Sequence, residues 1–189
     1  MQIKSLTSGA FPRILGVVAL LFYAIHATIS IRAHESSNLL WLCNAGALLI
    51  GMGLILGRLE PLGIGLLWSM LGNTVWTMFV YFGATFHWSS LLTHAGGLII
   101  GLMGARLMGL PARTWLWALL SLPVLQILSR LFTRKADNVN VAFRIQDGLG
   151  DRFDNYLTFW ILVFLTCALC FIIFEFLLRK LFVKKVERI

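Results

Sequence analysis

Two side chains that could carry out acyl chemistry lie near the starts of separate apolar stretches of the sequence. Cys43 occurs in the segment LWLCN at residues 40–44, and His94 occurs in the segment LTHAG at residues 92–96. An imidazole can take the proton of a neighbouring thiol, and the thiolate then attacks ester or thioester carbonyls. The pair therefore predicts acyl transfer or ester hydrolysis, with Cys43 as the nucleophile and His94 as the base.

Four other polar residues could assist this pair. Reaction at a carbonyl develops negative charge on its oxygen, and amide or hydroxyl groups can stabilise that charge through hydrogen bonds. We expect the residues that bind the substrate or stabilise the oxyanion to be Asn44, Asn73, Thr93 and His26.

The composition of the chain places these residues in a membrane. Hydrophobic residues make up 59% of the 189 residues and charged residues 13%, whereas soluble domains have about 45–50% and about 25%. This excludes a large soluble domain, a zinc ribbon or a dinucleotide-binding unit. The net charge of +8 could suggest nucleic acid, but the basic residues lie at the ends of apolar runs, where anionic headgroups attract them. We expect membrane lipids as partners, and no nucleic acid.

Six apolar runs divide the chain. They lie near residues 12–32, 38–57, 61–82, 90–108, 115–132 and 156–182. A helix needs about 20 apolar residues to cross a hydrocarbon core about 30 Å thick. The runs predict an all-α, polytopic transmembrane bundle of six helices that forms one domain over residues 1–189. Because small residues let helix backbones approach closely in lipid, we expect packing faces at Gly53 and Gly57 and at Gly97, Gly101 and Gly104.

The distribution of basic residues predicts an orientation. An even number of spans puts both termini on one side of the membrane, and that side holds most of the 16 basic residues: Lys4, Arg13, Arg58, Arg106, Arg113, Arg179, Lys180, Lys184, Lys185 and Arg188. Basic residues are retained on the cytoplasmic side. We therefore expect cytoplasmic termini, in a bacterial inner membrane, and an outward-facing loop at residues 133–155.

Counting along the spans brings the polar residues to one depth. Cys43 and Asn44 come about five residues into the second span, roughly 8 Å at 1.5 Å per residue. His94 lies at a similar distance into the fourth span, and His26 lies a similar distance before the end of the first. Alternating topology puts all of them near the outward face, with Asn73 slightly deeper.

The two short motifs also resemble a known group of membrane proteins. LWLCN and LTHAG are similar to the Leu-Cys and Ser-His-Gly elements of the bacterial YwaF-like integral membrane proteins and the related vertebrate ether-lipid acyltransferase. These are distantly similar to the androgen-induced-gene family of transmembrane fatty-ester hydrolases. The resemblance implies that Cys43 is the nucleophile and His94 the base. The sequence departs from the pattern at Thr93, where serine is usual, and at Asn44, where an acidic residue often follows the cysteine.

Three other functions are compatible with the same residues. His26 and His94, at matching depth, could ligate one haem iron in a redox protein. Asn73, Thr74 and the histidines could line the path of a small-solute carrier, in which Glu175 would be the acidic residue within a span. The glycine faces alone would be sufficient for a structural subunit of a membrane complex.

We predict no metal site and no cofactor for the enzyme. His26, His94 and a loop carboxylate could bind zinc, but His34-Glu35 is not followed by the second histidine of a His-Glu-x-x-His element. Cys167 and Cys170 have redox-motif spacing without a strand before them, so core packing is expected. Arg130, near a span end, is expected to extend to the interface or to bind an anionic headgroup.

Overall fold

The structure is a computed structural model of the chain and describes residues 9–83 and 86–181. All regular structure within these residues is helical. The long elements are Ala10–Arg32 (α2), Leu42–Leu56 (α3), Leu59–Tyr81 (α4), Gly97–Met108 (α5), Thr114–Leu120 (α6), Leu122–Phe132 (α7) and Tyr156–Leu181 (α8). The short ones are Ser36–Leu40 (η1), Leu92–Gly96 (η2), Lys135–Asp137 (η3), Val139–Val141 (η4) and Gly150–Arg152 (η5). The predicted all-α class is confirmed.

The six predicted spans correspond to six apolar helical segments. Four are long and apolar enough to cross a membrane: α2, α4, the combined α6–α7 segment Thr114–Phe132, and α8. The shorter two are α3 and the segment Leu92–Met108, in which η2 continues into α5. The second segment begins later than predicted, because extended backbone at Trp41 separates η1 from α3. The predicted end at Phe182 and the basic residues Lys4, Lys184, Lys185 and Arg188 lie outside the described residues.

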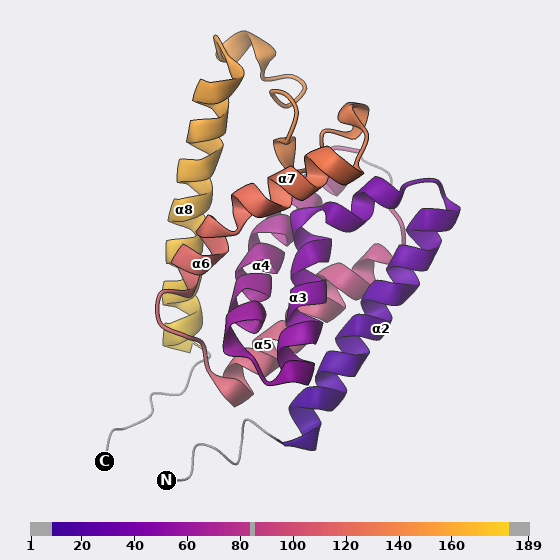
Figure 1. Cartoon of the computed structure of the whole chain (residues 1–189), viewed down its shortest axis with the longest axis vertical. Helices are drawn as coiled ribbons and strands as arrows, with labels where there is room; N and C mark the ends of the chain where they lie inside the picture. Colours follow the sequence, from indigo (N-terminus) through magenta and orange to yellow (C-terminus); the bar gives the residue numbers. More distant parts are fainter. Residues whose placement is uncertain (1–8, 84–85, 182–189) are drawn as a thin grey trace.

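Helices α3 and α4 form the centre of the bundle, with α2 on one side and α8 on the other (Figure 1). Glycines bring the two central backbones together. A Cβ at Gly65 would lie 2.5 Å from the Gly46 carbonyl oxygen, and one at Gly53 would lie 2.5 Å from the Leu62 amide nitrogen. Such contacts allow dispersion and backbone interactions over a long helix pair in lipid.

The predicted glycine face on α5 is confirmed. On α3, Gly53 packs as predicted and Gly57 does not. Gly97 faces Ala47, and Gly101 and Gly104 face large apolar side chains of α3 and α4. Gly57 instead ends α3 with a left-handed φ of 65°, a conformation that glycine adopts without steric cost.

The fifth span is bent where α6 meets α7. Pro123 is the second residue of α7, two positions after Ser121, and a proline inside a helix removes one backbone hydrogen bond and clashes with the preceding turn. After the bend, α7 crosses the end of the bundle at which α3 begins (Figure 1), where it packs against η1 and η4.

Glu175 joins α8 to the start of α6. Its carboxylate accepts the Trp115 amide at 2.6 Å and the Arg179 Nε at 2.7 Å. Arg179 also donates to the Pro111 carbonyl. A carboxylate at a helix N-terminus satisfies an otherwise free amide and interacts favourably with the helix dipole. The acidic residue that a carrier could use is therefore engaged in helix capping.

Candidate functional site

His94 lies in η2, a single turn of π-helix at the start of the fourth segment. The Gly97 amide reaches the Leu92 carbonyl across this wide turn, and the Asn73 Nδ2 donates to the His94 carbonyl at 2.8 Å. The Asn73 Oδ1 lies 2.6 Å from the His94 Nδ1. Trp76 stacks on the imidazole with a centroid distance of 4.1 Å. Two successive turns of α4 thus hold a ring that is only 3% exposed.

The Asn73 contacts determine which nitrogen of neutral His94 carries the proton. Because Nδ2 must donate to a backbone carbonyl, Oδ1 faces the ring and can only accept. The His94 Nδ1 therefore carries the hydrogen, and Nε2 carries the lone pair. This is the tautomer that a general base needs, with its orientation fixed by a third group.

Cys43 lies in the first turn of α3 and is 6% exposed. It packs directly on Gly72 of α4, where an added Cβ would lie 2.8 Å from the Cys43 Cβ and 2.6 Å from its amide nitrogen. The preceding residue, Leu42, donates its amide to the Asn140 Oδ1 at 3.0 Å. The position of the thiol is thus determined both by α4 and by the loop above.

Cys43 and His94 contact adjacent residues of one helix. Cys43 packs on Gly72, His94 is bonded to Asn73, and α3 also contacts η2. Within the described residues no hydrogen bond joins Cys43 to a histidine. The two predicted catalytic groups therefore share one region of the bundle without a direct bond in this state.

His26 occupies the α2 side of the same region. Its Nδ1 lies 3.0 Å from the Ser89 Oγ, and its Nε2 lies 3.4 Å from the Asn44 Nδ2. The Asn44 Nδ2 also donates to the Asn38 carbonyl at 2.8 Å. The Asn44 Oδ1 is buried and has no partner among the described residues. His26 on α2 therefore bonds to Ser89 and to the start of α3, while Asn44 presents an unpaired acceptor.

The predicted oxyanion donors already donate hydrogen bonds to other groups of the protein. Thr93 donates to the Ser90 carbonyl at 3.2 Å, Asn73 donates to the His94 carbonyl, and Asn44 donates to Asn38 and lies near His26. Sequence shows which residues carry hydrogen-bonding groups, but not where their hydrogens point. Stabilisation of an oxyanion by Thr93 or Asn44 requires one of these bonds to be exchanged, whereas Asn73 keeps its second amide hydrogen.

A loop of residues 133–155 covers this end of the bundle, and its key residue was missed at the sequence level. The Asn140 Nδ2 donates to the Leu40 carbonyl at 2.7 Å and to the Ser129 Oγ at 3.0 Å. Asn140 and its neighbours Asn138 and Val141 have φ values of 53°, 45° and 50°. Left-handed backbone is uncommon outside glycine, particularly for a β-branched residue. The repeated asparagines of Asn138-Val139-Asn140 are the signal that could have indicated such a turn.

A second contact secures the loop at η1. Asp137 accepts a hydrogen bond from the Ser37 Oγ at 2.5 Å and two from Arg134 at 3.0 Å. The Arg134 hydrogen bonds, followed by that of Ser37, lower the pKa of the Asp137 carboxyl. The carboxylate form therefore stabilises the docked loop.

The remaining predicted residues do not contact Cys43 or His94. Cys167 and Cys170 are half-buried on α8. Arg130 donates to the Ala142 carbonyl at 2.5 Å and to the Tyr156 hydroxyl at 3.3 Å. Its guanidinium therefore binds the covering loop. Among the described residues no group of three or more His, Cys, Asp or Glu side chains could hold a metal ion.

Comparison with known proteins identified no matching family model, no matching curated protein and no matching solved structure.

Proposed function

We propose that the chain is an integral membrane enzyme that transfers or hydrolyses lipid acyl groups. The observation that carries this proposal is the placement of Cys43 and His94 against adjacent residues of α4, Gly72 and Asn73. A nucleophile, a base and a group that orients the base are the parts that covalent acyl transfer needs. Here the orienting group is an amide, which fixes the ring without adding a negative charge.

The chemistry would proceed through a thioester. The His94 Nε2 takes the Cys43 thiol proton, and the thiolate attacks the ester carbonyl carbon. The carbon–oxygen bond to the leaving alcohol breaks, and His94 returns the proton to that oxygen. A second alcohol or water, deprotonated by Nε2, then attacks the thioester and releases the thiol. The first step requires the thiol to move within hydrogen-bond reach of Nε2, and catalytic hydrogen bonds commonly tighten only when substrate binds.

The orientation forms part of the proposal. The start of α2 and the end of α8 lie at the same end of the bundle, opposite the end that α7 covers (Figure 1). Arg106 near the end of α5 and Arg179 near the end of α8 also belong to this end. Basic residues favour the cytoplasmic side. The site would then face the outer leaflet of a bacterial inner membrane.

A thiol-reactive lipid analogue tests the proposal. We expect an alkyne-tagged fatty acyl chloroacetamide to label the protein in lipid nanodiscs at Cys43, and Cys43→Ala to remove this labelling. General bases contribute about 10²–10⁴-fold to rates, so His94→Gln should slow Cys43 labelling at least roughly 10²-fold. Cys167→Ala and Cys170→Ala are the matched controls and should label like the original chain. Labelling that is unchanged in folded His94→Gln would refute the assignment of the base.

Turnover must follow the same residues. Ester hydrolysis or acyl exchange on a mixed phospholipid substrate should be lost in Cys43→Ala, and Cys43→Ser should retain only a small fraction. Asn73→Ala should lower turnover without removing it, because the imidazole loses its orienting bond while Nε2 stays present. Full turnover in folded Cys43→Ala would refute the proposal.

A further inference from the structure

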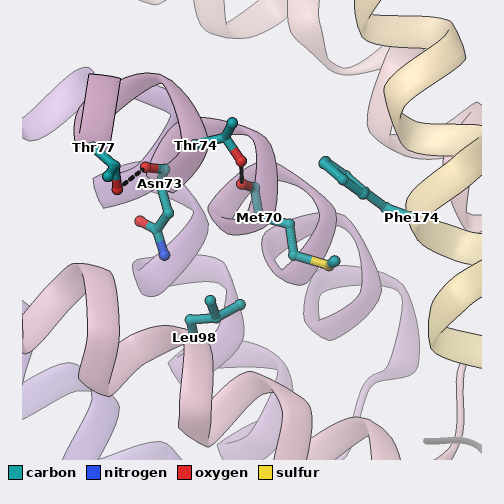
Figure 2. A pocket seen from close by; sticks show the side chains of 6 residues that line it. All are labelled: Met70, Asn73, Thr74, Thr77, Leu98 and Phe174. Atoms are coloured by element: carbon teal, nitrogen blue, oxygen red, sulfur yellow. Dashed lines mark hydrogen bonds between the residues drawn. The ribbon is translucent and has the colours of Figure 1, made fainter. Parts of the chain in front are cut away.

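A shallow groove of about 280 Å³ lies where α4, α5 and α8 meet. Its lining residues are Met70, Asn73, Thr74, Thr77, Leu98 and Phe174. Figure 2 shows the Phe174 ring extending from α8 toward Thr74 and Met70 of α4, while Leu98 of α5 closes the side nearest Asn73. The volume is close to the lower limit of about 300 Å³ for small-molecule sites.

The groove is largely apolar, because most polar groups of its lining residues are engaged within the protein. Thr74 donates its hydroxyl hydrogen to the Met70 carbonyl at 3.0 Å, and Thr77 donates to the Asn73 carbonyl at 2.8 Å (Figure 2). The Asn73 amide is engaged with His94. A polar ligand would find no free donor on either threonine, and on Asn73 only the second amide hydrogen. A hydrocarbon chain needs none.

The groove also leads to the candidate site. Along α4 it extends from Met70 to Thr77, about 10 Å at 1.5 Å per residue, toward the end of the bundle that holds His94. Asn73 belongs to both the groove and the candidate site, since it lines the groove and orients the His94 imidazole. A chain in the groove would therefore pass the group that holds the base.

We propose that this groove binds one hydrocarbon chain of a membrane lipid, with the methyl end near Phe174 and the ester end toward Asn73. The direction of the chain rests on the proposed function, whereas its occupancy of the groove does not. The surrounding bilayer is already apolar, so preference for the groove comes from packing and not from removal of water.

Photocrosslinking in nanodiscs tests the occupancy. The probe is phosphatidylcholine with a diazirine in one acyl chain, and the crosslinked residues are mapped by mass spectrometry. We expect residues 70–77 and 174 to be labelled about fivefold more than lipid-facing residues elsewhere on α8, which corresponds to about 1 kcal/mol. Uniform labelling around the bundle, or crosslinks between two copies of the chain, would overturn the proposal.

Two matched substitutions make the test specific. Thr74→Trp should fill the groove and abolish the excess labelling. Thr28→Trp is the control, because Thr28 is also exposed, also donates to the carbonyl four residues earlier, and lines a groove of similar size that is formed by α2 alone. Equal loss in both variants would overturn the proposal.

The experiment separates the groove from the chemistry. His94→Gln removes the base and leaves the groove lining in place, so its excess labelling should persist although turnover is lost. Excess labelling of the original chain together with no acyl-transfer activity of that chain would refute the proposed function alone. Turnover without excess labelling would refute the groove alone.

Discussion

Asn140 should be the residue on which the structure of the covered end depends most. Its side chain accepts the Leu42 amide at 3.0 Å and donates to the Leu40 carbonyl at 2.7 Å and the Ser129 Oγ at 3.0 Å. A net hydrogen bond contributes about 0.5–1.5 kcal/mol. Loss of all three should therefore lower the free energy of unfolding by about 1.5–4.5 kcal/mol.

The backbone adds a second, separable contribution. Asn140 has a φ of 53°, and a left-handed conformation costs a residue with a Cβ about 1–2 kcal/mol, a cost that asparagine often reduces and glycine avoids. Asn140→Ala should therefore be less stable than Asn140→Gly by about 1 kcal/mol. Both variants lose the same hydrogen bonds.

Two measurements would check this prediction. Denaturant unfolding in detergent gives the loss of stability, and hydrogen exchange of a peptide that contains Leu42 reports whether the start of α3 is released. Asn155→Ala is a control at an exposed helix cap, where Asn155 accepts the Thr158 amide at 2.9 Å; it should cost about 1 kcal/mol without faster exchange at Leu42. Equal stability of Asn140→Ala and the original chain, or unchanged exchange, would refute the reasoning.

Three further predictions concern packing, pH and capping. Gly72→Ala should destabilise the fold by about 1–3 kcal/mol and slow Cys43 labelling, because the new methyl group meets the backbone of α3. Gly150→Ala is the control, since Gly150 has open space around it, and it should change neither the stability nor the labelling rate. The Arg134 guanidinium and the Ser37 hydroxyl lower the pKa of Asp137 in the folded chain. The stability that Asp137 contributes is therefore complete above the ordinary pKa of about 3.9 and is lost as pH falls through the lower pKa of the folded chain. The melting temperatures of the original chain and of Asp137→Asn should converge in acid, and a difference that stays constant with pH would contradict this. Glu175→Ala should lower the melting temperature while leaving the Cys43 labelling rate within about twofold of the original, since it releases the start of α6 at the opposite end; an unchanged melting temperature would contradict the capping role.

The fold class could be predicted because lipid imposes it. A chain in hydrocarbon must satisfy its backbone groups internally, so apolar runs of sufficient length become helices. The predicted boundaries failed where local conformation intervened. Trp41 interrupts the second span, and Pro123 bends the fifth. A proline can be read from the sequence, but the non-helical backbone conformation of Trp41 cannot.

The candidate site could be predicted in part. Counting residues along the spans placed Cys43 and His94 near the starts of their segments, where the structure also has them. Neither the π-turn at His94 nor the hydrogen bond between His94 and Asn73 could be predicted by counting residues, because both depend on how η2 is rotated against α4. The engaged hydrogens of Asn44 and Thr93 are likewise set by partners on other elements.

By itself, then, the sequence determined six apolar helices, the glycines that let them approach, and the polar residues they carry, since composition and period along one chain are sufficient for these. Tertiary structure alone decided which groups meet. Asn140 reaches Leu40 across 100 positions of sequence, and Asn73 selects the tautomer of His94. Such pairings depend on the relative rotation and register of separate helices, which a period along one helix does not contain.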